Sequence, residues 1–302
     1  MIEAAILVAR LLQYLGAAIL FGSSLFFLYA LPPTGPAAAS VRGWARPLLV
    51  GAAVILAASS AGAVAAQASL FAGSWSDGLT REAIGAVVSS MDFGKAAVVR
   101  LGAAMAALAL LIALPRGRAA WSAAAGAGAV ASASLAWMGH AAATEGPWAA
   151  PHRVADAIHA LAAAAWIGAL VVLLRMASER GAGSVQHTAL RSALLRFSVV
   201  GPLLVTAIVL TGFVNAWVLV GPGGIGALAA TPYGLTLLLK LALFAAMVAL
   251  AAANRFLFTA LTAQPGLSLG PLRLSLALET AAGFAVLGVV ARLGTLVPPT
   301  AA

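Results

Sequence analysis

The side chains best suited to chemistry gather around the middle of the chain. His152, Asp156 and His159 are spaced i, i+4 and i+7, so on a helix they would lie along one face. Met138 and His140 precede them by a short connection. Imidazole nitrogens suit copper, and a thioether sulphur selects the cuprous form. The pattern therefore predicts a copper-binding site, with these proposed ligands: His140, His152, His159, Asp156, Met138 and, further away in the chain, Met91.

A purely structural role is the alternative for the same residues. Asp156 could pair with Arg153 or Arg10, and His159 could form a hydrogen bond inside a helix bundle. The chain has no cysteine, which excludes disulfides and thiolate metal sites, so a soft metal would depend on methionine and histidine. Both interpretations, a metal site and a set of paired structural groups, stay open from these residues alone.

The composition places these side chains in a membrane. Of the 302 residues, 63% are hydrophobic and 8% are charged, and the mean hydropathy is +1.05. Soluble domains have about a quarter of their residues charged, so that class is excluded. Apolar runs of the roughly 20 residues needed to cross a bilayer occur near residues 4–31, 47–72, 94–114, 119–140, 152–175, 194–220, 234–258 and 272–297. The sequence therefore predicts an all-α polytopic membrane protein with eight transmembrane helices.

The arginines divide the connections between these runs into two sides. The connections after odd-numbered helices hold most of them, namely Arg42, Arg46, Arg116, Arg118, Arg175, Arg180, Arg191, Arg196, Arg255 and Arg273. By the positive-inside rule this side is cytoplasmic, so both termini are expected in the periplasm. The net charge of +9 is then a topology signal. Membrane lipid is the expected partner, and nucleic acid is not.

The two halves of the chain resemble each other. Residues 8–22 and 154–168 look like two copies of one helix, in which Arg10 and Gln13 correspond to Asp156 and His159. This predicts two four-helix membrane repeats, residues 1–143 and 150–302, which share one orientation and are related by an axis along the membrane normal. The outer connections differ, because 79–91 predicts a short amphipathic helix on the membrane surface, whereas 221–232 predicts a glycine-rich loop.

Polar side chains within a bilayer cost about 2.5–3.5 kcal/mol each, so they are functional or paired. Arg10, Arg100 and Lys240 fall near the depth of the proposed ligands and would oppose copper binding. Three such cations favour an anion or quinone headgroup instead, which keeps an electron-transfer function open. Glu279 is expected to pair with an arginine near the inner membrane surface or to form a proton-linked site. The predicted pocket residues are Arg10, Gln13, Arg100, Lys240, Trp166 and Glu279.

Sequence motifs for catalysis are absent. Residues 221–226 satisfy the literal pattern of a dinucleotide-binding glycine loop, but no strand precedes them. The sequence has no phosphate-binding lysine loop, no nucleophile elbow and no helical His-Glu metalloprotease motif. We therefore expect no nucleotide and no enzymatic activity.

An ordered set of motifs resembles the copper resistance D (CopD) family of bacterial inner-membrane proteins. The set is His140, His159 with residues 166–168, residues 231–234 running to Lys240, and then residues 254–255. The resemblance is strongest over residues 137–262. It implies a multi-pass inner-membrane protein that handles a copper ion, Cu⁺ or Cu²⁺, sometimes with a periplasmic CopC-like copper-binding protein as partner. Several relatives have a histidine on the first helix where Gln13 stands, which implies a weaker site or one confined to helices four and five.

Three functions are consistent with this pattern. The first is copper transport, with copper captured by histidines at the periplasmic mouth. The second is copper delivery by an assembly factor that does not transport. The third is electron transfer by a b-type cytochrome, in which two imidazoles ligate each haem iron. The depths of His140 and His159 differ by about two helical turns, which argues against a shared haem.

Overall fold

The computed structural model describes residues 1–32, 34–179, 184–263 and 269–299. This part of the chain contains eight helices long and apolar enough to cross a membrane, which confirms the predicted all-α membrane architecture. The long helices are α1 (Ile2–Ala18), which continues through a π-helical turn η1 (Ile19–Ser23) into α2 (Ser24–Ala30), α3 (Pro36–Ala72), α6 (Asp92–Ala113), α7 (Arg118–Ala133), α9 (Ala149–Ala177), α10 (Ser184–Leu219), α12 (Pro232–Ala263) and α13 (Gly270–Leu293).

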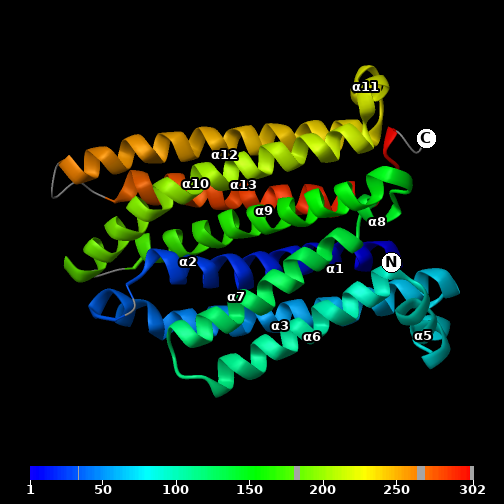
Figure 1. The fold of residues 1–302 in the computed structure, drawn as a ribbon, viewed down its shortest axis with the longest axis horizontal. Helices are drawn as coiled ribbons and strands as arrows, with labels where there is room; N and C mark the ends of the chain where they lie inside the picture. The colour runs from blue at the N-terminus through cyan, green and yellow to red at the C-terminus, as the bar shows by residue number, and fades with distance from the viewer. Residues whose placement is uncertain (33, 180–183, 264–268, 300–302) are drawn as a thin grey trace.

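The long helices lie side by side in one elongated bundle (Figure 1). Both chain ends lie at the same end of the bundle, here called the terminal end. The short helices α4 (Trp75–Gly78), α5 (Arg81–Ser90), α8 (His140–Ala143) and α11 (Gly221–Gly224) are also at this end. The connections rich in arginine form the other end, called the arginine end, although Arg180 lies outside the described residues. Which end faces the periplasm stays a prediction, as does the division into two repeats.

The centre of the bundle is a close crossing between η1 and α9. A Cβ atom added to Gly22 would lie 2.0 Å from the Ala164 carbonyl oxygen, and one added to Gly168 would lie 2.4 Å from the Gly22 carbonyl carbon. The Ser23 hydroxyl also donates a hydrogen bond to the Gly168 carbonyl, at 3.2 Å. The two backbones therefore touch directly, as small residues permit between membrane helices. Gly22 and Gly168 are matching positions of the predicted repeat.

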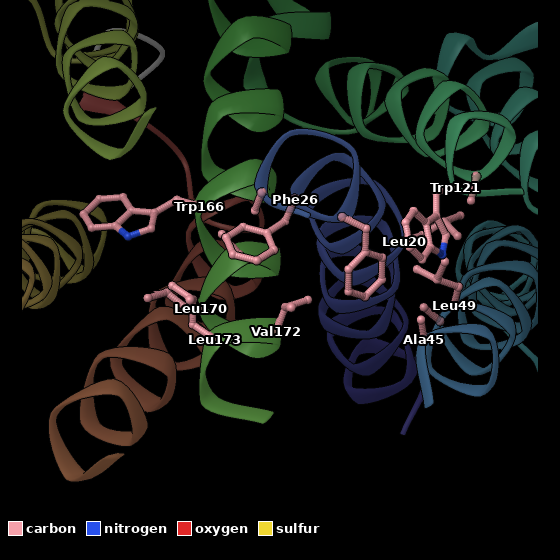
Figure 2. Close-up of a cluster of buried hydrophobic side chains, with 14 of the residues drawn as sticks. Leu20, Phe26, Ala45, Leu49, Trp121, Trp166, Leu170, Val172 and Leu173 are labelled. Atoms are coloured by element: carbon pink, nitrogen blue, oxygen red, sulfur yellow. The ribbon is translucent and has the colours of Figure 1, made fainter. Parts of the chain in front are cut away.

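Large apolar side chains fill the space on both sides of this crossing. Phe26 on α2 lies toward α9, and Val172 is on the side of α9 that faces the first helix, whereas Leu170 and Leu173 project from the other side of α9 (Figure 2). On the opposite side of the first helix the same core continues into α3 and α7 (Figure 2), and it includes Leu49 and Trp121. Thus α1, η1, α2 and α9 form the middle layer of the bundle, and the other spans pack around them.

The outer connections differ from the prediction in one place. Residues 221–232 are not a loop, because α11 and a 3-10 helix η4 (Ile225–Ala230) occupy most of this segment. The helix expected within 79–91 is present as α5, where Val87 is buried and packs against Val64 of α3 and Ala97 of α6. The apolar face of α5 therefore covers protein, and is not directed only at the membrane surface.

Gly168→Ala is expected to lower the free energy of unfolding by about 1–3 kcal/mol, because the new methyl group would push two backbones apart. Gly102→Ala on α6 is the matched control, since its added Cβ meets nothing within 4 Å. There, the better helix propensity of alanine should leave stability unchanged or raise it by about 0.5–1 kcal/mol. Thermal unfolding in detergent measures both variants. Equal effects at the two positions would contradict the close crossing.

Candidate metal site at the terminal end

His140 begins the short helix α8, which follows a 3-10 turn η2 (Ser134–Trp137) at the end of α7. Its Nε2 atom lies 2.8 Å from the Leu296 carbonyl oxygen, beyond the end of α13. Its ring contacts Tyr233 of α12 edge-on, with 5.7 Å between ring centroids. A carbonyl only accepts hydrogen bonds, so Nε2 must carry the hydrogen. In the neutral ring, Nδ1 then holds the free lone pair.

His152 is buried in the first turn of α9 and is oriented by Thr144. The Thr144 hydroxyl donates to the His140 carbonyl at 3.1 Å and lies 2.8 Å from Nδ1 of His152. Because the hydroxyl has a single hydrogen and donates it to the carbonyl, it accepts from Nδ1–H of His152. The lone pair of this neutral ring is therefore on Nε2. The same threonine thus links the two histidines nearest the terminal end, which are close enough to interact electrostatically.

Asp156 and His159 point toward α10 instead. The Asn215 amide donates to Asp156 Oδ1 at 2.9 Å, and His159 Nδ1 lies 3.0 Å from the Thr211 hydroxyl. Thr211 donates its own hydrogen to the Ala207 carbonyl, so it accepts from His159, whose Nε2 is again the lone-pair atom. The alternative in which Asp156 pairs with Arg153 or Arg10 is not what the structure shows, because the hydrogen bond that Asp156 accepts comes from an amide.

The predicted ligands therefore divide into two groups along α9. His140 and His152 form an outer pair at the terminal end, while Asp156 and His159 form an inner pair against α10. Across the described ranges, no three histidine, aspartate or glutamate side chains are grouped so that they could hold one metal ion. The charge of Lys240, which is half-buried on α12, acts on both members of the inner pair.

Arg100 is fully buried on α6, and its hydrogen-bond partners among the described residues are neutral. Its Nε donates to the Ser134 hydroxyl and one terminal nitrogen donates to the Ser134 carbonyl, both at 3.1 Å, while the other donates to the Gln13 side chain. That nitrogen also lies 3.9 Å from the Met138 sulphur. Met138 therefore faces a guanidinium, and a copper cation at its sulphur would be repelled by that charge.

Arg10 joins the first helix to two distant segments. It donates to the Gly294 carbonyl at 3.0 Å and to the Met138 carbonyl at 3.2 Å. Within the described part of the chain, its Nε is a buried donor without an acceptor. Most polar side-chain atoms of these residues, Arg10, Gln13 and Arg100, thus form hydrogen bonds between different segments of the bundle.

The structure places three predicted residues away from the outer pair. Met91 lies between α5 and α6 in the small apolar cluster beneath α5. Trp166 and Glu279 meet further along the bundle, where the indole Nε1 donates to Glu279 Oε1 at 3.1 Å. The Asn254 amide donates to Glu279 Oε2 at 2.8 Å. Of the two alternatives for Glu279, the arginine partner is not what the structure shows, since neutral donors bond to both carboxyl oxygens.

Sequence reasoning missed the residues that orient the histidines and Asp156. Thr211 and Asn215 are four residues apart, so they lie on one face of α10, in its mostly apolar second half. That spacing complements Asp156 and His159 on the facing helix, and it could have indicated from the sequence that the two pairs of polar residues meet. Thr144 gave a weaker signal, because it lies in a short connection whose conformation the sequence does not predict.

Comparison with known proteins identifies the family of the chain. The family described as copper resistance protein D-like, N-terminal domain, matches residues 1–150, and the family described as copper resistance protein D matches residues 191–293. Copper resistance protein D of Pseudomonas syringae pv. tomato is 34% identical over 299 residues, which cover 96% of this chain and 95% of that protein. Inner membrane protein YebZ of Escherichia coli (strain K12) is 36% identical over 166 residues, 54% of this chain and 55% of that protein. No solved structure matches.

His140 should stay neutral to a lower pH than free imidazole, whose pKa is about 6.5. Burial lowers the pKa of His140, the hydrogen bond to the Leu296 carbonyl raises it by less, and the charge of Arg10 lowers it. A lowered pKa keeps the ring nitrogen free of a proton as the pH falls, so protons compete less with a metal. Histidine-labelled ¹⁵N NMR, with the signal assigned by its loss in His140→Gln, measures the protonation midpoint.

Arg10→Gln should move that midpoint to higher pH, because a positive charge near the ring has been removed. Arg292→Gln removes the same charge from an exposed position at the same end of the bundle and is the control. An equal shift in the two variants, or a wild-type midpoint above that of free imidazole, would contradict the assigned environment of His140.

Proposed function

The chain belongs to the copper resistance protein D family, and we propose that it captures copper at the terminal end of the bundle and moves it into or across the membrane. It is a multi-pass protein of the bacterial inner membrane with a role in copper resistance. In the proposal the terminal end faces the periplasm, as the arginine distribution predicts. Copper is the cargo, and no chemical reaction is catalysed.

One observation carries this proposal, namely the hydrogen bonding of the outer pair. His140 and His152 each use one ring nitrogen as a donor to a fixed oxygen, which leaves the other nitrogen as a lone-pair donor. Histidines that bind metals are usually oriented in this way, by a second hydrogen bond that fixes the tautomer and the ring plane. Neutral imidazoles suit copper in either oxidation state. The outer pair therefore has the chemistry of a copper entry site.

The inner pair supplies the next position along the same helix. Asp156 lies four residues beyond His152, or about 6 Å along the helix axis, and His159 lies about 4.5 Å further. His159 has the same donor arrangement as the outer histidines, because Thr211 accepts from its Nδ1. We propose that copper passes from the outer pair to this pair as it enters the bundle. Met138 and Met91 are left out of the path, the first because of Arg100 and the second because it packs under α5.

Loss of the outer pair should weaken copper binding strongly. His140→Ala or His152→Ala is expected to raise the dissociation constant about 10-fold or more, whereas His187→Ala, at an exposed position on α10, should leave it unchanged. Competition with a chromophoric chelator measures the affinity, and elemental analysis of the purified protein measures copper and iron together. Equal effects of all three substitutions would contradict the assignment of His140 and His152 as copper ligands. Stoichiometric iron would indicate a haem protein instead.

The orienting hydroxyl offers a finer test. Thr144→Val removes the acceptor for His152 Nδ1–H while keeping the size of the side chain. Because loss of such a partner typically lowers metal affinity 10- to 100-fold, we expect the copper dissociation constant to rise by about 10- to 100-fold. Thr236→Val is the matched control, because Thr236 also donates to a carbonyl four residues earlier but contacts no histidine. If both variants bind copper like the wild type, His152 is not a ligand.

Copper uptake into proteoliposomes distinguishes a transporter from a delivery factor. A transporter should accumulate copper inside vesicles, and His159→Ala should slow uptake more than it lowers the amount of copper bound at the outer pair. A delivery factor that hands copper to another protein, such as a periplasmic CopC-like partner, should give binding without uptake. Absence of uptake by the wild-type protein would therefore overturn the transport part of the proposal and leave the binding part standing.

A further inference from the structure

A second polar cluster lies deeper in the bundle, between α9, α12 and α13. Its centre is Glu279, whose side chain is 1% exposed. Trp166 donates to one carboxyl oxygen and Asn254 donates to the other, at 3.1 and 2.8 Å. Phe244 closes the cluster from α12 by packing edge-on against the Trp166 ring, with 5.9 Å between centroids. The carboxyl group is thus enclosed by protein, and these two hydrogen-bond donors are neutral.

Two charged side chains on the surrounding helices are engaged elsewhere. On α9, Arg175 pairs with Glu179 at 3.6 Å, and Arg273 of α13 donates to the Ala177 carbonyl. Arg255 of α12 is exposed, next to Asn254. Both hydrogen bonds that the Glu279 carboxyl accepts come from neutral groups. A buried carboxylate without a cation is unfavourable, so the neutral acid is the favoured form of this group.

The remaining ionisable groups of these helices lie toward the terminal end. His159 and Asp156 precede Trp166 on α9 by about two and three helical turns, and Lys240 precedes Asn254 on α12 by about four. The helix α1 also packs against α13, and its Arg10 donates to the Gly294 carbonyl. Gly294 lies just beyond the end of α13 that is farther from the Glu279 carboxyl. At about 5.4 Å per turn, these separations along the helices are roughly 10 Å or more. None of these groups neutralises the carboxyl by direct contact.

Two buried polar atoms beside the carboxyl have no hydrogen-bond partner within the described ranges, namely Asn254 Oδ1 and the Ser275 hydroxyl. Ser275 precedes Glu279 by four residues, so the two lie on one face of α13. A carboxylate needs donors, which the indole and the amide supply. A protonated carboxyl also needs an acceptor for its own hydrogen, and a rotated Asn254 amide or the Ser275 oxygen can provide one. The cluster can therefore satisfy both protonation states.

From this geometry we propose that Glu279 is a proton-binding site within the membrane, which holds a proton in the resting protein and releases it when a change in its surroundings stabilises the carboxylate. The step is the reversible transfer of one proton to or from a carboxyl oxygen. Glu279 lies closer to the start of α13 at Gly270 than to its end at Leu293, so the shorter path for the proton leads to the arginine end. This inference does not depend on copper transport.

Infrared difference spectroscopy of the copper-free protein in lipid tests the proposal. We expect the carbonyl stretching band of a protonated carboxylic acid at neutral pH, which disappears in Glu279→Gln and returns in Glu279→Asp. Asp156→Asn is the matched control and should leave that band in place, because Asp156 is in a different cluster. Thermal unfolding of each variant establishes that a lost band does not come from a lost fold.

The hydrogen bond from the indole gives a second readout. Trp166→Phe removes the N–H donor to Glu279 Oε1 and should move the carbonyl band to higher frequency, whereas Trp217→Phe, at an exposed site on α10, should not. A spectrum in which Glu279→Gln removes no acid band at any pH would show a permanent carboxylate and overturn the proposal. So would a band that is lost on adding sodium or potassium at constant pH, because the site would then bind a metal cation.

Discussion

The direct contact between the backbones of η1 and α9 is the constraint on which the bundle depends. Without water in the bilayer core, helices gain little from burying apolar side chains against each other, so their association depends on close packing. Gly22 and Gly168 allow that approach, and Ser23 adds a hydrogen bond across it. Arg10 precedes Gly22 by the same interval at which Asp156 precedes Gly168. The crossing therefore sets the depth of the polar side chains on both helices.

Most buried polar groups discussed above follow one physical rule, which is that a buried donor needs a nearby acceptor, and Arg10 Nε and the Ser275 hydroxyl are exceptions within the described residues. Arg100 meets this requirement with two serine oxygens and a glutamine, and it does so without an acidic partner. The histidines meet it with oxygens that are already fixed in place, such as hydroxyls that donate their own hydrogens to helix carbonyls. The result is a set of neutral rings with defined lone pairs, and the nearby Arg10 and Arg100 are held by structural contacts.

The sequence predicted the number of spans well, because hydropathy and length depend on each segment alone. It also placed His152, Asp156 and His159 on one helix, toward the terminal end of the bundle. It did not predict their partners, since Thr211 and Asn215 lie far away in the chain, as the 52- and 59-residue separations show. Arginine was one candidate partner for Asp156 and for Glu279 from charge alone, whereas amide and indole groups donate to these carboxyls. Residues 221–232 were expected to be a loop because of their glycines, yet they form helical turns.

The depth of Glu279 has an electrical consequence. A carboxyl group enclosed in the middle of a membrane bundle lies within the field of the transmembrane potential, so any change in its charge moves charge through part of that field. Moving one elementary charge through the whole membrane is worth about 2.3 kcal/mol for each 100 mV or so of potential. The fraction that applies here is set by the position of the residue on α13. If Glu279 exchanges a proton as proposed, its occupancy depends on the membrane potential as well as on pH.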